Sequence, residues 1–256
     1  MDWWDNRDKE LQRILKVLKD MPEKPKTEPK PMKEEPVRIA QTVTKAPAPE
    51  PVQIPKAPLY RPAVLPLKLL TAEEFLEPRY IRLLEQRIET VIRAEAPISS
   101  GMLTRRVVQS FGIARAGSRI QSHMDKLLGR MQLRTTLQEG CLFFWDSTQT
   151  PETHPGFRVS GEGDSRRDIR DVPVQEAANA MYTVLYEQVS MSREDLLRET
   201  ANKLGYTRLG TNVVSAMNQA ISYAQSQGAV TTGTNGTIIL SKGGTARAEA
   251  VLKSLG

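Results

Sequence analysis

The segment that decides the fold occurs twice. Phe111-Gly112-Ile113-Ala114-Arg115-Ala116-Gly117-Ser118-Arg119-Ile120 is followed 93 residues later by Leu204-Gly205-Tyr206-Thr207-Arg208-Leu209-Gly210-Thr211-Asn212-Val213. Both glycines and the arginine keep their spacing, and apolar and hydroxyl residues match at the flanking positions. Identities extend outward, pairing Leu103 with Leu196, Arg105 with Arg198 and Met124 with Met217. We therefore predict an internal duplication of one structural unit.

The first copy has the pattern of three helices followed by a β-hairpin. A helix is expected to begin near Pro78, because the missing N–H of proline would have no partner in a first turn, and to end before Pro97. Ser99 is a predicted N-cap for the second helix, and Gly112 is expected to end it in the left-handed conformation. The third helix and the two β-prone runs are predicted at residues 118–128, 132–136 and 141–145.

The second copy repeats this order of elements. Its first helix carries Met181, Val184 and Leu185 on one face, and Ser192 is a predicted N-cap for the next. Runs at 229–232 and 237–240 flank the hairpin turn. Three helices and a hairpin are typical of the winged-helix form of the helix-turn-helix. The predicted fold is mainly α with small β-hairpin wings, in two tandem modules that follow a Pro-rich linker.

The proline distribution sets the rest of the organisation, because 12 of the 17 prolines fall between residues 22 and 66. Such a composition favours extended conformations and cannot bury enough surface to form a core, so we predict a disordered linker; a docking peptide for an aromatic groove is the alternative. We predict an amphipathic helix at 1–20, the linker at 21–74, module 1 at 75–145, a connector at 146–173, module 2 at 174–242 and a tail at 243–256.

The charge of +6 is concentrated in module 1, where residues 79–145 hold eleven basic against five acidic side chains. An electropositive module of this architecture suggests DNA as the partner. Helical spacing places polar side chains of the third helix opposite its apolar stripe, while further arginines in the second helix, the turn and the wing base supply phosphate contacts. The predicted DNA-binding residues are Arg105, Arg106, Arg115, Arg119, Ser122, Lys126, Arg130 and Arg134.

Module 2 lacks this charge. Residues 174–242 hold five basic and five acidic groups, and its third helix has no Lys or Arg from 211 to 228. We expect a protein-docking or structural role for it. The arginines shared by the two turns, Arg115 and Arg208, have a second interpretation as fold elements that bond carbonyls at a helix end. In the connector, Arg166 and Arg167 are candidates for DNA contact, but the neighbouring Asp164 and Asp168 favour local charge pairs.

The sequence does not contain the motifs of a catalytic centre. It has no Gly-x-x-x-x-Gly-Lys-Ser/Thr phosphate loop, and it has one cysteine, Cys141, and two histidines, His123 and His154. We expect no enzyme activity, no cofactor and no metal site. Trp145 is interpreted as packing within the wing or core in preference to a base-stacking platform. The lone cysteine and the absence of a signal or membrane-spanning pattern predict a cytoplasmic protein that does not contact a membrane.

One ordered series of residues resembles a known family. Ala96-Pro97-Ile98, Phe111-Gly112, Gly117-Ser118-Arg119-Ile120 and Phe143-Phe144-Trp145 are similar to a bacterial domain of unknown function at the C-terminal end of very large superfamily 1 DNA helicases. The segments after it, and Trp3-Trp4-Asp5-Asn6-Arg7 with the helix that follows, resemble neighbouring parts of the same proteins. The resemblance implies a C-terminal fragment of a helicase–nuclease protein whose motor lies elsewhere.

Two functional hypotheses follow from these observations. The first is a non-catalytic DNA-binding accessory region of a helicase or nuclease system, in which module 1 contacts DNA through its third helix and wing. The second is a protein-interaction scaffold that recruits a helicase or nuclease and has no significant DNA affinity of its own. A helicase or nuclease protein is a partner under both hypotheses, and the sequence predicts no oligomeric state.

Overall fold

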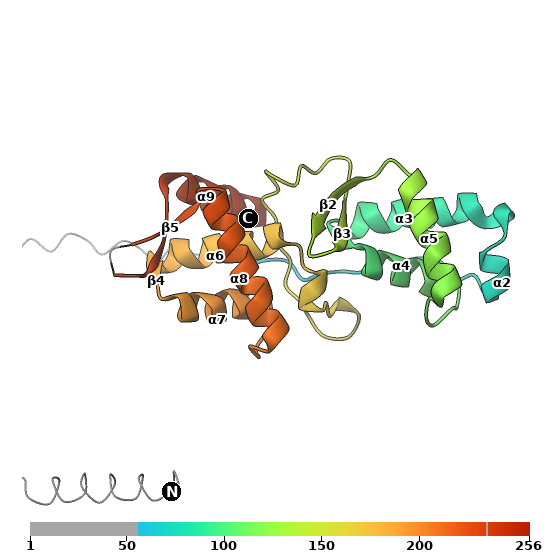
Figure 1. The fold of residues 1–256 in the computed structure, drawn as a ribbon, viewed down its shortest axis with the longest axis horizontal. Coiled ribbons are helices and arrows are strands. Elements are labelled where there is room, and N and C mark those ends of the chain that lie inside the picture. Colours follow the sequence, from blue (N-terminus) through green and yellow to red (C-terminus); the bar gives the residue numbers. More distant parts are fainter. Residues whose placement is uncertain (1–55, 234) are drawn as a thin grey trace, which may run out of the picture. The chain divides into compact units, whose positions relative to one another are not determined.

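The computed structural model describes residues 56–233 and 235–256, and the predicted helix at 1–20 lies outside them (Figure 1). A short helix, α2 (Ala72–Phe75), begins at a capping box in which Thr71 and Glu74 exchange side-chain and backbone hydrogen bonds. Pro78 opens a 3₁₀ turn that continues into α3. Local sequence therefore specifies both helix starts at the beginning of module 1, through the Thr71–Glu74 capping box and through Pro78.

Module 1 has the predicted winged-helix order. Its elements are α3 (Ile81–Glu95), β1 (Ile98–Ser99), α4 (Ser100–Gln109), α5 (Ser118–Arg130), β2 (Arg134–Gln138) and β3 (Cys141–Trp145). The sheet order is β1-β3-β2, antiparallel throughout, with Ile98 opposite Phe144. The Ser99 hydroxyl accepts the backbone N–H of Met102, and Gly112 has a φ of 77°, so both predicted helix boundaries are confirmed.

Module 2 repeats module 1 element by element. Its elements are α6 (Val174–Gln188), β4 (Ser190–Met191), α7 (Arg193–Lys203), α8 (Thr211–Ser226), β5 (Val230–Thr232) and β6 (Ile238–Leu240), with sheet order β4-β6-β5. The helices α6 and α8 each begin 93 residues after α3 and α5, as the sequence repeat predicts. The Ser192 hydroxyl accepts the N–H of Asp195 and caps α7. The duplicated winged-helix fold is confirmed.

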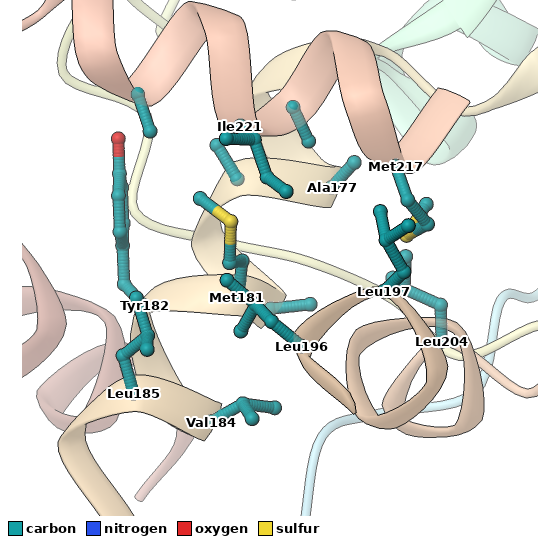
Figure 2. Packing of buried hydrophobic residues seen from close by; sticks show 14 of the residues in the cluster. Ala177, Met181, Tyr182, Val184, Leu185, Leu196, Leu197, Leu204, Met217 and Ile221 are labelled. Carbon is teal, nitrogen blue, oxygen red and sulfur yellow. The ribbon is translucent and has the colours of Figure 1, made fainter. Parts of the chain in front are cut away.

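Each module has its own hydrophobic core. The core of module 2 surrounds α6, whose residues 176–185 are all buried because α7, α8 and the C-terminal helix α9 (Lys242–Leu255) pack on different sides of it. Figure 2 shows Met181 of α6 between Ile221 of α8 and Leu196 of α7. We predicted a tail at residues 243–256, but residues 243–255 belong to α9, whose Ala248 and Val251 are buried in this core.

The segment before module 1 also differs from the prediction. Residues 56–74, which the proline content assigned to the disordered linker, lie against the folded modules. Tyr60 is fully buried, and its N–H donates to the carbonyl of Val159 at 2.9 Å. The N–H of Leu70 donates to the carbonyl of Phe111 at 3.0 Å. Ala57 contacts the core of module 2, whereas Tyr60 belongs to the core of module 1. Residues 56–74 therefore connect the two modules.

The connector contributes to the core in the same way. Phe157, Ile169 and Val172 are buried in the core of module 2 although they lie in the segment predicted to be only a connection. The N–H of Ser160 donates to the carbonyl of Leu204 at 2.8 Å. This part of the connector thus packs as part of module 2.

The close approach of the connector to Gly205 makes a testable prediction. Gly205 has a φ of 91°, and a Cβ at this position would lie 2.3 Å from the carbonyl oxygen of Ser160. Gly205→Ala is expected to lower the free energy of unfolding by about 2–4 kcal/mol, because left-handed strain and a backbone clash act together. Gly228→Ala is the matched control: its φ is 62° but the space is open, so only the strain of about 1–2 kcal/mol applies. Thermal unfolding of both variants measures the difference, and equal losses would contradict the close approach.

Candidate nucleic-acid interface

The helix α5 has one apolar and one polar face. Ile120, Met124 and Leu127 are buried against module 1, and this packing fixes the rotation of the helix about its axis. The opposite face carries Arg119, Ser122, Lys126 and Arg130, all of them exposed. Their spacing of three or four residues places these side chains in one row along the helix. The row runs along the outward face of the third helix, which is the usual groove-reading element of a winged helix.

The cations of this row are available to a ligand. Within the part of the chain that the structure describes, Arg119, Lys126 and Arg130 form no ion pair. The carboxylate of Asp125 lies on the same helix and accepts a hydrogen bond of 2.8 Å from Gln121. Burial lowers the pKa of His123, and the charges of Arg130 and Lys126 lower it further. The imidazole therefore stays neutral beneath a positively charged surface.

Arg105 and Arg115 extend this surface around the turn between α4 and α5. Both side chains are exposed and line one hollow of about 380 Å³ together with Gln121. Neither guanidinium, nor that of Arg208 in module 2, donates a hydrogen bond among residues 56–233 and 235–256. The structure thus gives no support to the interpretation of Arg115 and Arg208 as carbonyl-bonding fold elements, and both guanidinium groups remain open to solvent.

Arg106 does not belong to this surface, contrary to the sequence-based expectation. Its Nε lies 3.3 Å from a carboxylate oxygen of the fully buried Glu95, and its Nη2 donates to the carbonyl of Asp164. Its side chain is only 19% exposed. Adjacent helical residues point about 100° apart, so Arg105 faces outward while Arg106 faces the core. Arg106 is therefore bonded within the protein and lies apart from the exposed cations, and its contact with DNA stays a prediction.

The wing of module 1 is partly occupied by module 2. At the tip of the hairpin, the Gln138 side chain accepts the N–H of Val174 at 2.7 Å and donates to Gln219 of α8 at 3.3 Å. At the base, Arg134 is exposed, and its guanidinium donates to the carbonyl of Gln149. Only the base of this wing therefore offers a cation, while its tip forms part of the contact between the modules.

The third helix of module 2 faces this contact. Asn212 and Ser215 of α8 line a hollow of about 550 Å³ together with Gly140 and Cys141 of the first wing. Asn218 accepts hydrogen bonds from Arg193 at 2.6 and 3.1 Å. Asn218 and Gln219 of α8 thus bond protein groups, while Asn212 and Ser215 on the same helix are exposed.

A buried charge network joins the modules beneath the surface. Glu176 at the start of α6 is fully buried and accepts hydrogen bonds from Arg158 and Arg167, the latter at 2.9 Å. Arg158 also donates to the carbonyls of Glu95 and Pro97 in module 1, at 2.7 and 2.8 Å. The expected pairing of Arg167 with Asp168 is wrong, because Asp168 pairs with Arg170 at 2.9 Å.

Tyr60 completes this network from the segment before module 1. Its ring lies under the guanidinium groups of Arg158 and Arg167, with centroid distances of 5.2 and 4.7 Å, and its hydroxyl donates to Glu95. Sequence reasoning missed all of these roles. Glu95 and Glu176 occupy the last and third positions of their helices, and no local pattern marks them as buried.

The network predicts a pH dependence of stability. Burial by itself would raise the pKa of Glu176, but Arg158 and Arg167 lower it to about 2 from its usual 4.5. The stabilisation, about 3 kcal/mol, is present above pH 4.5 and is lost as the pH falls towards 2. Burial raises the pKa of Glu95, so its protonation acts in the opposite direction. The difference in unfolding free energy between the native chain and Glu176→Gln should shrink from pH 6 to pH 2, and a constant difference would contradict the pairing.

The remaining candidate residues pack within the protein. Trp145 is buried, its indole N–H donates to Thr136 at 2.9 Å, and its ring meets His154 edge to face at 5.3 Å, so the packing interpretation is confirmed. No group of three or more His, Cys, Asp or Glu residues gathers at a metal-binding spacing in the described ranges. In the same ranges, no helix is both long and apolar enough to cross a membrane.

Comparison with known proteins identifies one similarity. Residues 73–122 match a family model described as a protein of unknown function, DUF3320. The matched range extends from α2 to the first turns of α5 and includes Arg105, Arg115 and Arg119. No curated protein and no solved structure matches the chain significantly.

Proposed function

We propose that this chain is a non-catalytic DNA-binding region in which module 1 contacts DNA through α5. The observation that carries this proposal is the exposed row of Arg119, Lys126 and Arg130 on the outward face of the third helix, which no carboxylate neutralises within the described residues. Phosphate contacts from such a row supply affinity, and Ser122 between the cations offers a hydroxyl to a base edge. Arg105 and Arg115 extend the contact across the turn.

The biological setting is part of the same proposal. The ordered resemblance to the C-terminal region of large bacterial superfamily 1 helicases favours an accessory role beside a helicase or nuclease in the cytoplasm. The match at residues 73–122 to a family of unknown function is compatible with this setting. Module 2 then serves as a support for module 1, because Gln219 of α8 bonds Gln138 at the tip of the first wing.

The salt dependence of DNA binding tests this function. The full chain is titrated against a fluorescently labelled DNA duplex at 50 and 200 mM salt. With about four phosphate contacts, the affinity is expected to fall about a hundredfold between these conditions, because each contact releases condensed counterions. Undetectable binding at the lower salt concentration, or an affinity independent of salt, would reject the proposal.

A second candidate function is a protein-interaction scaffold. One observation favours it: Val64, Leu67 and Leu69, in the segment that leads into module 1, are 95%, 68% and 76% exposed. Three large apolar side chains within six residues are costly to leave in water and are typical of a protein-binding surface. Under this function the chain recruits a helicase or nuclease and shows negligible DNA affinity at physiological salt. The same titration separates the two functions.

A further inference from the structure

A second arginine cluster lies away from α5. A hollow of about 1320 Å³ opens between α4 of module 1, the connector and the start of α8 in module 2. Arg105, Arg166 and Arg208 line it and belong to three different parts of the chain. The fold therefore brings together cations that lie 42 to 103 residues apart in the sequence.

The hollow has a net positive charge when ion pairs between its side chains and neighbouring residues are taken into account. Arg105, Arg166 and Arg208 are exposed, and none of the three forms an ion pair in the described part of the chain. Two carboxylates also line the hollow. Asp168 is held by Arg170 through hydrogen bonds of 2.9 Å to each of its oxygens, which leaves Glu162 opposite three cations. A net positive hollow of this kind attracts an anion.

Backbone donors add to the attraction. The helix α8, 16 residues long, begins after Gly210, and no side chain caps it. Thr211, Asn212 and Val213 of its first turn line the same hollow as the three arginines. The first N–H groups of a helix have no partner within the helix, and its dipole favours negative charge at this end. Guanidinium groups and free N–H groups together match the oxygen atoms of a phosphate group.

We infer that this hollow binds a backbone phosphate of the same DNA that α5 contacts, so that the DNA path continues from module 1 onto the start of α8. This inference rests on the proposed function and extends it. Arg105 makes the path continuous, because it lines both this hollow and the smaller one that contains Arg115 beside the start of α5. Arg208 lies in the turn of module 2 at the position that Arg115 has in module 1, so the two arginines would contact phosphate in the same way.

The double variant R166Q/R208Q of the full chain tests the inference. Both side chains are exposed and make no hydrogen bonds among the described residues, so thermal unfolding is expected to stay unchanged. DNA affinity is expected to fall about tenfold or more, and the slope of log affinity against log salt to decrease by about 1, because one phosphate contact is lost. The control K242Q/K253Q removes two exposed cations of α9 in the same module and is expected to leave both values as they are.

The outcomes separate this inference from the proposed function. If R166Q/R208Q binds DNA like the native chain while substitutions on α5 weaken binding, the hollow is not a phosphate site and the proposed function stands. If the native chain does not bind DNA, the proposed function fails, and inorganic phosphate tests the hollow by NMR at constant ionic strength. Shifts of the Thr211 and Asn212 amide signals that disappear in R166Q/R208Q would then support a site for a small phosphate compound. Their absence in the native chain would overturn the inference.

Discussion

Replacing Glu176 by glutamine is expected to lower the free energy of unfolding at neutral pH by about 3–5 kcal/mol. Glu176 is fully buried and neutralises Arg158 and Arg167, of which Arg167 is itself only 2% exposed. Without the carboxylate, both guanidinium groups stay in a region of low dielectric constant, and each has lost its ion pair with Glu176. A loss of this size is a large fraction of the stability of a typical domain. Chemical denaturation followed by circular dichroism measures it.

A matched substitution on the same helix provides the control. Glu187, near the end of α6, forms an ion pair with Lys203, and the two side chains are 30% and 26% exposed. Glu187→Gln is expected to cost less than about 1 kcal/mol, because water solvates the remaining lysine. The comparison keeps the helix, the residue type and the change in charge constant and varies the burial and the number of cationic partners. Similar losses for Glu176→Gln and Glu187→Gln would show that the buried network does not stabilise the contact between the modules.

Reversing the charge of α5 is expected to produce the largest functional effect. The double variant R119E/K126E places two carboxylates two helical turns apart in the exposed row of cations. DNA affinity at 50 mM salt is expected to fall at least a hundredfold, and the salt dependence should flatten, because phosphate contacts are replaced by repulsion. Both side chains are exposed and unpaired within the described residues, so the fold should remain unchanged. Fluorescence anisotropy and thermal unfolding test the two statements.

The control for net charge is R82E/R93E on α3. Arg82 and Arg93 are exposed and belong to the same module, and the control changes the net charge by the same amount as R119E/K126E. If DNA binding depends on the position of the charge, R82E/R93E retains most of the affinity. Equal loss in both double variants would mean that module 1 attracts DNA only through its total charge, and α5 would then lose its assigned role.

The elements of both modules were predictable because local rules specify them. Ser99 and Ser192 each bond an N–H at a helix start, and Gly112 and Gly205 both have positive φ values where the helices end. These interactions span only a few residues. A sequence that recurs after 93 residues therefore forms the same local structures a second time. The same rules placed Arg119 and Lys126 on the exposed face of α5, because the apolar stripe of a helix defines its opposite side.

Local rules failed where contacts between distant segments decide the environment of a side chain. Arg105 and Arg106 are neighbours and looked equivalent, but the buried Glu95 accepts a hydrogen bond from Arg106 and removes it from the surface. Tyr60 lies among prolines, and composition assigned it to a linker, yet it is fully buried beneath two arginines. The wing was predicted to contact DNA, but Gln138 at its tip bonds to module 2.

The repeat around Gly112 and Gly205 therefore predicted two winged-helix modules in this chain, and the charge count predicted that only the first has a basic third helix. Tertiary structure alone decided which charges face water and which lie buried between the modules. The physical reason is the range of the interactions. Caps, turns and apolar periodicity act within one or two helical turns, whereas Arg158 reaches Glu176 and the carbonyl of Glu95 across 18 and 63 residues of sequence.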